Sequence, residues 1–385
     1  MKKKIYWCLQ QLNNIGGTEM VTLQIIRMLH NDYEIHLVPF DVVDKSNIKY
    51  DIPSDVIIED ISFPKDVIQF DANLFKYLQN KHFLKALNLL FQFFITYAFR
   101  RFFIRSKLRK ISSQDDIFVF SSMELLAFAS KKRYNIQHFH FNSISYNSFL
   151  SKFLKIGSRK PNHIVFLTES TKKAVDKKNK LKCSVIPNPS RYERKQNFEY
   201  HHNTLISACR LEAQKNPMML VKIAKELKDL NFNYTFNIYG SGTFLKPMED
   251  YIKEHDLTNV HIISGVTNLE PCYMSSDLYL ITSNFEGFPL SVIEANSLSL
   301  PVIWKDMKDP TSSCVVNGVN GYIIDSKDPK DFALKIIEVL SNKEELVKLK
   351  ESTYEFASKY EENNIKELWI KFFEEQFINA NKRTF

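Results

Sequence analysis

The chain alternates short apolar runs with longer segments whose apolar residues recur at helical spacing. Three runs in the first half, Lys3 to Leu9, His36 to Phe40 and Asp116 to Ser121, are predicted strands because they are short and apolar. The second half repeats the pattern, from Leu205 to Leu211 through to Leu278 to Ile281. Strands that alternate with helices in this way are typical of parallel sheets covered on both faces. We therefore predict an α/β fold.

The apolar periodicity stops between the two halves. Pro187 and Pro189 precede a charged stretch that has neither strand nor helical spacing, so a domain boundary is expected near residues 188–203. A chain of 385 residues is also too long for one ordinary core. We predict two doubly wound, Rossmann-like domains facing a cleft, at residues 1–188 and 189–365. The apolar and aromatic pattern of residues 366–385 predicts a terminal helix that packs back on the first domain.

One stretch combines strand, loop and helix signals with two carboxylates. The strand ending at Ile281 is followed by polar residues, then by Glu286 and Gly287, and helical spacing begins at Pro289. Glycine lets backbone amides approach a ligand and proline suits the first helical turn, so the helix amides can face an anion. Glu294 shares a face with apolar neighbours, where a carboxylate is costly unless another group bonds to it.

The eight-residue step from Glu286 to Glu294, with Gly287 and Phe288 after the first acid, resembles the E-x7-E region of retaining glycosyltransferases of family 4, which have the GT-B fold. The resemblance implies that Glu294 binds the ribose of a nucleotide diphosphate sugar and that Glu286 binds a sugar hydroxyl. It also implies that the backbone from Gly287 through Phe288 and Pro289 to Leu290 faces the diphosphate.

Two cations and a glycine turn complete the predicted donor site. Arg210 and Lys215 stand at either end of a loop, where a guanidinium fork and an ammonium group can grip a diphosphate. The family has an R-x4-K here, although Cys209 replaces the glycine that often precedes its arginine. Gly240 and Gly242 form another glycine turn between a strand and a helix. Taken as isolated residues, the two cations would be ordinary surface charges.

A second glycine loop follows the first predicted strand. Gly16 and Gly17 precede a helix for which Thr18 is a plausible N-cap, and Glu19 lies in its first turn. The loop is either a plain turn or a further anion cradle. The resembled family has a G-G-x-E loop across the interdomain cleft from the donor diphosphate, which implies that Gly16 and Gly17 bind the donor.

Two histidines lie on one face of a predicted strand, His138 and His140. They could form part of a metal site, but no third ligand lies nearby, so a hydrogen-bonded core histidine is the simpler interpretation. The resembled family carries a histidine beside the transferred sugar. His140 fits that place best and is the predicted catalytic histidine, with His138 as the alternative.

The amino-acid composition limits the ligands and the cellular compartment expected for this protein. A net charge of +8 permits nucleic acid, anionic lipid or phosphorylated substrates, but no aromatic and basic motif for nucleic acid is present. The five scattered cysteines favour free thiols in a reducing compartment. The short apolar start does not have the pattern of a signal peptide. We expect a cytoplasmic protein that needs neither a metal nor a cofactor beyond its nucleotide sugar.

The basic charge gathers in residues 76–110, which hold nine cations and no acid. Within them, residues 82–103 predict a helix with a narrow polar stripe, too polar to span a membrane. It is either a buried core helix or a helix lying in the interface of an anionic membrane, with Arg100, Arg101 and Arg105 on the headgroups. Several members of the resembled family attach to membranes through this domain, so the protein is expected to be cytoplasmic or peripheral on the inner face of the cell membrane.

Together these features predict a metal-independent, retaining glycosyltransferase that uses a nucleotide diphosphate sugar, which we take to be UDP-linked. The predicted acceptor is a cell-surface glycan, a teichoic-acid-like polymer or a lipid-linked glycan. One alternative is a sugar-nucleotide epimerase of similar shape, and another is a non-catalytic basic protein that binds RNA or membrane. Neither the transferred sugar nor the linkage follows from the sequence.

Overall fold

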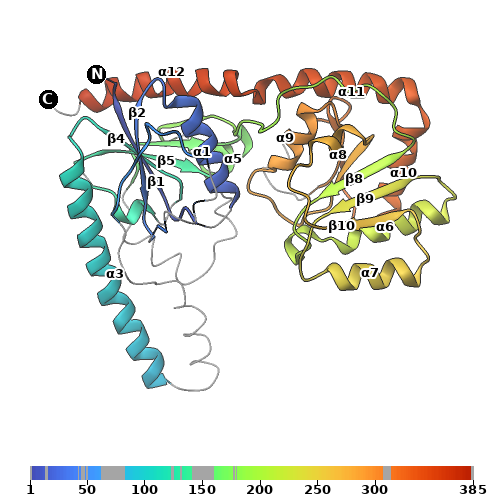
Figure 1. Ribbon diagram of the computed structural model, residues 1–385, viewed down its shortest axis with the longest axis horizontal. Coiled ribbons are helices and arrows are strands. Elements are labelled where there is room, and N and C mark those ends of the chain that lie inside the picture. Colours follow the sequence, from blue (N-terminus) through green and yellow to red (C-terminus); the bar gives the residue numbers. More distant parts are fainter. Residues whose placement is uncertain are drawn as a thin grey trace. The chain divides into compact units, whose positions relative to one another are not determined.

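The computed structural model describes residues 2–13, 16–41, 43–44, 48, 51–61, 83–122, 125–130, 132–140, 160–176, 178, 180–306 and 314–382. The chain forms two compact units, each built around one sheet (Figure 1). The first unit comprises Met1–Phe166, Lys180–Ser184 and Leu368–Phe385. The second comprises Leu167–Asn179 and Val185–Glu367.

The first sheet has the strand order β3-β2-β1-β4-β5-β6-β7. Its strands are β1 (Lys4–Leu9), β2 (Glu34–Pro39), β3 (Ile57–Ile58), β4 (Ile117–Phe120), β5 (Tyr134–Phe139), β6 (His163–Phe166) and β7 (Cys183–Val185). The described helices of this part are α1 (Gly17–Leu29), α3 (Phe83–Ile111), the 3₁₀ helix η2 (Leu125–Phe128) and the end of α12 (Glu362–Asn381). Because β1 pairs in parallel with both β2 and β4, the strand order reverses there, which is the switch point of a doubly wound sheet.

The second sheet repeats this order as β10-β9-β8-β11-β12-β13, and every neighbouring pair is parallel. Its strands are β8 (Thr204–Ala208), β9 (Thr235–Tyr239), β10 (Val260–Ile263), β11 (Leu278–Ile281), β12 (Val302–Lys305) and β13 (Gly321–Ile324). Its helices are α5 (Glu169–Val175), η4 (Ala213–Lys215), α6 (Met218–Asp229), α7 (Leu245–Glu254), α8 (Glu270–Met274), α9 (Leu290–Ser297), α10 (Pro329–Ser341), α11 (Lys343–Ala357), η6 (Ser358–Tyr360) and the start of α12.

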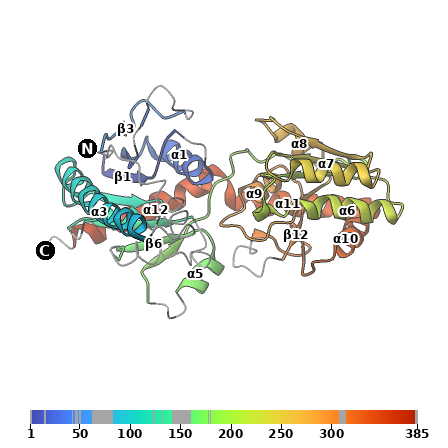
Figure 2. The same ribbon diagram turned by 90° about the horizontal axis from the view of Figure 1, so that it is seen from below.

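Helices cover both faces of the second sheet. Successive strand residues point to opposite faces, so Leu278 and Leu280 pack in one core with α6, α10 and α11, whereas Tyr279 and Ile281 pack in another with α8 and α9. Figures 1 and 2 show α6 and α7 side by side along this sheet. The two doubly wound parallel sheets confirm the predicted α/β fold class.

The end of α12 belongs to the core of the first unit. The Trp369 ring centroid lies 5.3 Å from that of Trp7 and 5.1 Å from that of His138. Phe373 approaches the ring of Tyr33 at 5.5 Å. Trp7, His138 and Trp369 are fully buried, so the last helix completes a layer of aromatic rings over the first sheet.

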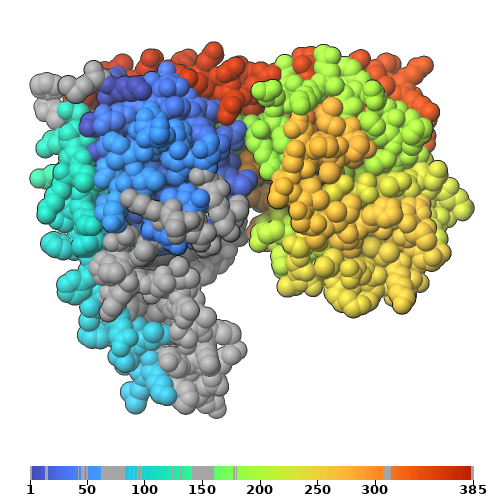
Figure 3. All heavy atoms as spheres, in the orientation of Figure 1, coloured from blue at the N-terminus to red at the C-terminus, as the bar shows by residue number. Residues whose placement is uncertain are grey.

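Helix α3 is divided into an exposed half and a packed half. Ile104 and Leu108 are buried against β4 and η2. The earlier turns leave a stripe of apolar side chains in solvent, at steps of three and four residues that keep them on one helix face. These exposed residues are Leu84, Leu87, Phe91, Ile95, Phe99 and Phe102, and the cyan part of α3 lies at the surface of its unit in Figure 3.

The basic residues of α3 differ in their exposure, with Arg100 turned inward while Arg109 and Lys110 are exposed. Arg100 is buried, and its Nη2 donates to Asp41 Oδ1 at 2.8 Å and to the Phe40 carbonyl at 3.0 Å. Arg105 donates to the Ala127 carbonyl at 2.8 Å. Lys76 and Lys81 lie outside the described residues. None of the described helices, α3 included, is both long enough and apolar enough to cross a membrane.

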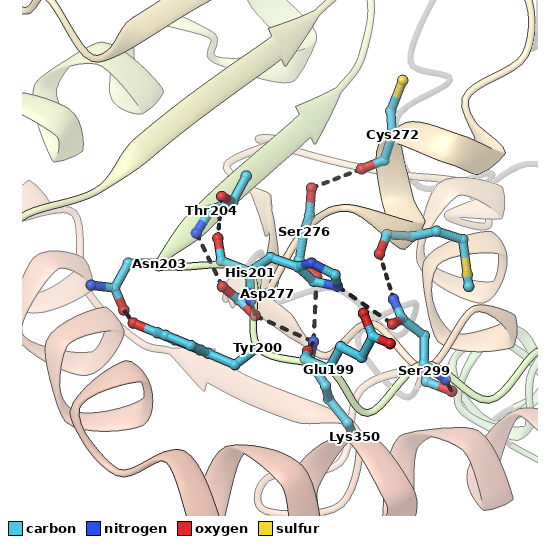
Figure 4. A network of polar contacts seen from close by, with 12 residues as sticks. Glu199, Tyr200, His201, Asn203, Thr204, Cys272, Ser276, Asp277, Ser299 and Lys350 are labelled. Carbon is cyan, nitrogen blue, oxygen red and sulfur yellow. Dashed lines mark hydrogen bonds and ion pairs between the residues drawn. The ribbon is translucent and has the colours of Figure 1, made fainter.

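A buried ion pair fixes the entry of the chain into the second sheet. Lys350 Nζ on α11 lies 3.3 Å from Asp277 Oδ1, and neither side chain is exposed to solvent (Figure 4). Asp277 Oδ1 also accepts from the His201 amide at 2.9 Å and its Oδ2 from the Thr204 amide at 3.1 Å. Burial lowers the pKa of Lys350, and the neighbouring Asp277 opposes that shift. The pair therefore ties α11, the start of β11 and the segment before β8 together.

Replacing Lys350 by Met tests this dependence. The variant leaves the Asp277 carboxylate buried without its cation, which should lower the free energy of unfolding by about 3 to 5 kcal/mol. Urea denaturation followed by circular dichroism measures the change. The matched control is Lys225→Met, which breaks the surface pair with Asp229 and should leave the free energy of unfolding almost unchanged. Equal stability of the two variants would show that the buried pair is not needed.

Candidate active site

The switch point of the second sheet lies between β8 and β11, where ligands of doubly wound folds bind at the carboxyl ends of strands. The loops that leave these two strands are hydrogen-bonded to each other. The Asn284 amide donates to the Gln214 carbonyl at 2.8 Å and Asn284 Nδ2 to the Ala213 carbonyl at 3.0 Å. Thr282 Oγ1 donates to the Lys215 carbonyl at 3.2 Å. These bonds form a fixed platform for the side chains that follow.

Lys215 and Glu286, 71 residues apart, meet on this platform. Lys215 Nζ lies 2.6 Å from Glu286 Oε1, and Ser283 Oγ donates to the same oxygen at 2.6 Å. Only 19% of the Lys215 side chain and 10% of the Glu286 side chain are exposed. The structure therefore brings these two predicted residues into direct contact, with a serine hydroxyl that sequence reasoning did not identify.

Two adjoining pockets open at this edge of the sheet. The larger has a volume of about 340 Å³ and is lined by Ala208, Cys209, Arg210, Tyr239, Gly240, Ser241, Ile263, Gly265, Val266, Leu269, Tyr273, Ser291 and Glu294. The smaller shares Ala208, Cys209 and Ser291 with it and adds Lys215 and Glu286. The predicted donor residues thus divide between two neighbouring spaces, Arg210 and Glu294 in one and Lys215 and Glu286 in the other.

Arg210 is exposed at the mouth of the larger pocket, and its Nη2 donates to Gln214 Oε1 at 3.2 Å. Cys209, which replaces the family's usual glycine, lines both pockets. Burial raises the pKa of the Cys209 thiol to about 11, so the thiol stays neutral near pH 7. It adds an apolar surface between the pockets instead of a charge.

Glu294 is a buried carboxylate with a cationic partner that the sequence did not reveal. Its Oε1 lies 3.0 Å from Nε of Arg191, and 10% of its side chain is exposed. Burial raises the pKa of Glu294, and the Arg191 guanidinium opposes that shift. The cost of a carboxylate on an apolar helix face is offset by this ion pair. Arg191 lies 103 residues earlier in a charged stretch, where no motif marks it.

The glycine turn after β9 packs directly on the loop that carries Arg210. A Cβ atom at Gly240 would lie 2.0 Å from the Cys209 carbonyl oxygen. At Gly242, with φ +153°, it would lie 2.6 Å from the Leu211 carbonyl oxygen. Both positions exclude a side chain because the two backbones touch, so these glycines shape the pocket wall.

The segment from Gly287 to Leu290 leads into α9. Phe288 packs toward Tyr360, with ring centroids 6.3 Å apart, and Pro289 occupies the N-cap position. The Leu290 amide donates to the Phe288 carbonyl at 3.0 Å. The Phe288 ring therefore has a packing role, and the backbone is the part of this segment left for ligand contact.

The remaining predicted residues belong to the first unit. Gly16 is the N-cap of α1 and Gly17 its first residue, so the prediction of Thr18 as the cap was wrong. The Glu19 side chain folds back over Gly16, where a Cβ atom would meet Glu19 Oε2 at 2.2 Å. Burial raises the pKa of the Glu19 carboxyl. The glycine at position 16 thus makes room for a partly desolvated acid.

His138 and His140 lie at the end of β5, with ring centroids 4.0 Å apart. His138 has no solvent exposure and neither ring nitrogen has a hydrogen-bond partner among the described residues, whereas 8% of His140 is exposed. Burial lowers the pKa of His140 to about 3, so its imidazole is neutral near pH 7. Across the described ranges no cluster of three or more His, Cys, Asp and Glu side chains is placed to hold a metal ion.

If Glu294 and Arg210 contact a nucleotide sugar, as the resemblance implies, Glu294→Gln and Arg210→Ala should each lower kcat/KM about tenfold or more, because each would remove a charged contact without opening a core cavity. Initial rates and thermal melting curves measure activity and folding together. Glu254→Gln, at an exposed position on α7, is the control and should retain parental rates. Parental turnover by both site variants would show that the site is assigned wrongly.

Comparison with known proteins identifies similar sequences and folds. Residues 190–356 match the family model described as glycosyl transferases group 1. The chain is 29% identical over 197 residues to the GtfA subunit of a UDP-N-acetylglucosamine–peptide N-acetylglucosaminyltransferase of Streptococcus agalactiae. The aligned residues make up 49% of this chain and 38% of that protein. It is 26% identical over 227 residues to the poly(ribitol-phosphate) alpha-N-acetylglucosaminyltransferase of Staphylococcus aureus, covering 58% and 46% respectively.

These matches span less than half the length of either relative. Over nearly the whole chain the fold is similar to the crystal structure of TarM of S. aureus, with a TM-score of 0.75 at 17% identity, covering 96% of this chain and 98% of TarM. Residues 190–356 therefore match glycosyl transferases group 1, and the chain has the GT-B fold.

Proposed function

We propose that the protein is a retaining glycosyltransferase that takes a hexose or N-acetylhexosamine from a UDP-linked donor. The observation that carries the proposal is the meeting of two cations and two carboxylates in adjoining pockets at the switch point of the second sheet. The larger pocket has the size and apolar lining for a nucleoside. The smaller space is only about 10 Å³, so the diphosphate and the sugar would lie outside it, next to Lys215 and Glu286.

In this proposal each charged residue has one task. Glu294 accepts hydrogen bonds from the ribose and Glu286 from a sugar hydroxyl, while Arg210 and Lys215 face the diphosphate. Negative charge grows on the departing diphosphate during transfer, and cations fixed at that place stabilise it in the transition state. Lys215 already touches Glu286, so one ammonium group would link the leaving phosphate to the acid that holds the sugar.

The chemistry exchanges one bond for another. The bond from the anomeric carbon to the phosphate oxygen breaks with its electron pair on UDP, the acceptor hydroxyl oxygen bonds to the same carbon, and the hydroxyl proton passes to the departing phosphate oxygen. Retention requires the acceptor to end on the face that UDP leaves. The word alpha in the name of the poly(ribitol-phosphate) relative supports retention, because common UDP-hexosamine donors are themselves alpha-linked. His140, neutral near pH 7, is the proposed group of the first unit that contacts the sugar.

The relatives also guide the proposed acceptor. One is named for transfer to a peptide and another for transfer to poly(ribitol-phosphate). We propose a cell-envelope glycan, a teichoic-acid-like polymer or a lipid-linked glycan as the acceptor class. The exposed apolar stripe on α3 supports work at the inner face of the membrane, with apolar insertion as the main attraction, since Arg100 is held inside the unit.

A screen of nucleotide sugars for release of the nucleoside diphosphate tests the function. We expect UDP release from one UDP-hexose or UDP-N-acetylhexosamine in the presence of an envelope polymer, and alpha-anomeric signals in the product by NMR. Activity should persist in excess EDTA, because the cations and helix amides of the site already supply positive charge. Inverted products, or activity lost in EDTA and restored by magnesium, would contradict the proposal.

Flotation with anionic vesicles tests the membrane contact. The parent should float with the vesicles, and a variant with Phe91, Phe99 and Phe102 changed to Ser should lose that binding, because their exposed rings supply the insertion. The matched control changes two exposed apolar residues on other helices, Leu334 and Ile378, to Ser. If the parent stays in the soluble fraction at low salt, the stripe does not bind membrane.

A further inference from the structure

The segment before β8 contributes a side chain that contacts Glu294, a residue that lines the larger pocket. Arg191 follows the Pro-Asn-Pro turn, and its Nε lies 3.0 Å from Glu294 Oε1. Its guanidinium also lies over the Tyr192 ring, 4.7 Å from the centroid. The contact is made to one carboxylate oxygen, Oε1, of a glutamate that also lines the larger pocket.

The backbone around Arg191 is held in place on both sides. The Ser190 amide donates to the Tyr360 carbonyl at 2.9 Å, and the Lys195 amide donates to the Ser297 carbonyl, at the end of α9, at 2.8 Å. Arg194 Nη1 donates to the Tyr354 carbonyl at 2.9 Å. Arg191 is therefore presented to α9 by a fixed segment, although 35% of its side chain is exposed.

The contact with Arg191 affects the charge of Glu294 because the carboxyl is buried. Among the described residues, Glu294 acts on the hydroxyls of Tyr192, Tyr273 and Tyr279, and burial raises the pKa of each hydroxyl, so they stay neutral near pH 7. Burial also favours the uncharged form of Glu294, and Arg191 is the group that opposes it. A neutral carboxyl would be a weaker acceptor for ribose hydroxyls than a carboxylate.

We propose that Arg191 is a positioning residue for donor recognition, which holds Glu294 ionised and oriented so that its second oxygen accepts from the ribose. The inference rests on the proposed function, since it requires a nucleoside diphosphate in the larger pocket. Arg191 acts through Glu294 and does not itself touch the nucleotide. The segment that holds Arg191 thereby takes part in donor recognition.

Calorimetric titration of UDP tests the proposal. Arg191→Met should weaken UDP binding about fivefold or more at neutral pH, by loss of a charged hydrogen bond to Glu294. UDP binding should weaken as Glu294 takes up a proton. Because Arg191 lowers the pKa of Glu294, its removal should make the loss of affinity on acidification begin at a higher pH than in the parent. Arg191→Lys should restore part of the affinity and return the pH profile toward that of the parent.

Two further variants separate this role from others. In a Glu294→Gln background, Arg191→Met should cause no additional loss, since its target is already gone. Arg194→Met loosens the same segment without touching the pocket and should leave UDP affinity unchanged. Melting curves for each variant confirm folding.

Four results would overturn the inference. Additive losses from Arg191→Met and Glu294→Gln would show that Arg191 acts independently of Glu294. Equal losses from Arg191→Met and Arg194→Met would show that anchoring of the segment alone matters. If the parent binds no UDP, both the proposed donor and the role of Arg191 are wrong. If the parent binds UDP and Arg191→Met binds it equally well, only the role of Arg191 is wrong, and the proposed donor stands.

Discussion

The parallel pairing of β8 with β11 is the constraint on which the site depends. Leu205 lies opposite Leu278 and Ile206 opposite Tyr279, so both strands end at the same edge of the sheet. Their following loops must then run side by side, and the Asn284 hydrogen bonds hold them there. A shift of either strand by one residue would turn its side chains to the other face and separate Lys215 from Glu286.

The two acids of the E-x7-E pattern have different partners because they belong to different elements. Glu286 lies in a loop and meets a lysine and a serine hydroxyl from the same edge. Glu294 lies within α9, surrounded by apolar neighbours, and is reached by an arginine from a distant segment. Each acid thus keeps a cation close while presenting its remaining surface to a pocket, which reconciles buried charge with access for a ligand.

Local patterns predicted the strand, loop and helix around Glu286, and the fold class followed from repeating those patterns. The sequence could not predict which charges pair across long separations. Arg191 with Glu294 and Lys350 with Asp277 join residues whose neighbours show no shared motif. On α3 the helical spacing was visible, yet the depth of each side chain depends on Asp41 and on η2, which lie elsewhere in the chain. Tertiary contacts therefore decided that Arg100 turns inward.

The first unit is built from separate parts of the chain, and this affects the order in which the two units can fold during synthesis. Its aromatic layer needs Trp369 and Phe373, which the ribosome adds only after nearly all of the second unit has emerged. Domains usually fold as units from the N-terminus, but here the unit that starts the chain is the last whose core can close. Until then Trp7 lacks the rings of Trp369 and Phe373 that cover it in the finished protein.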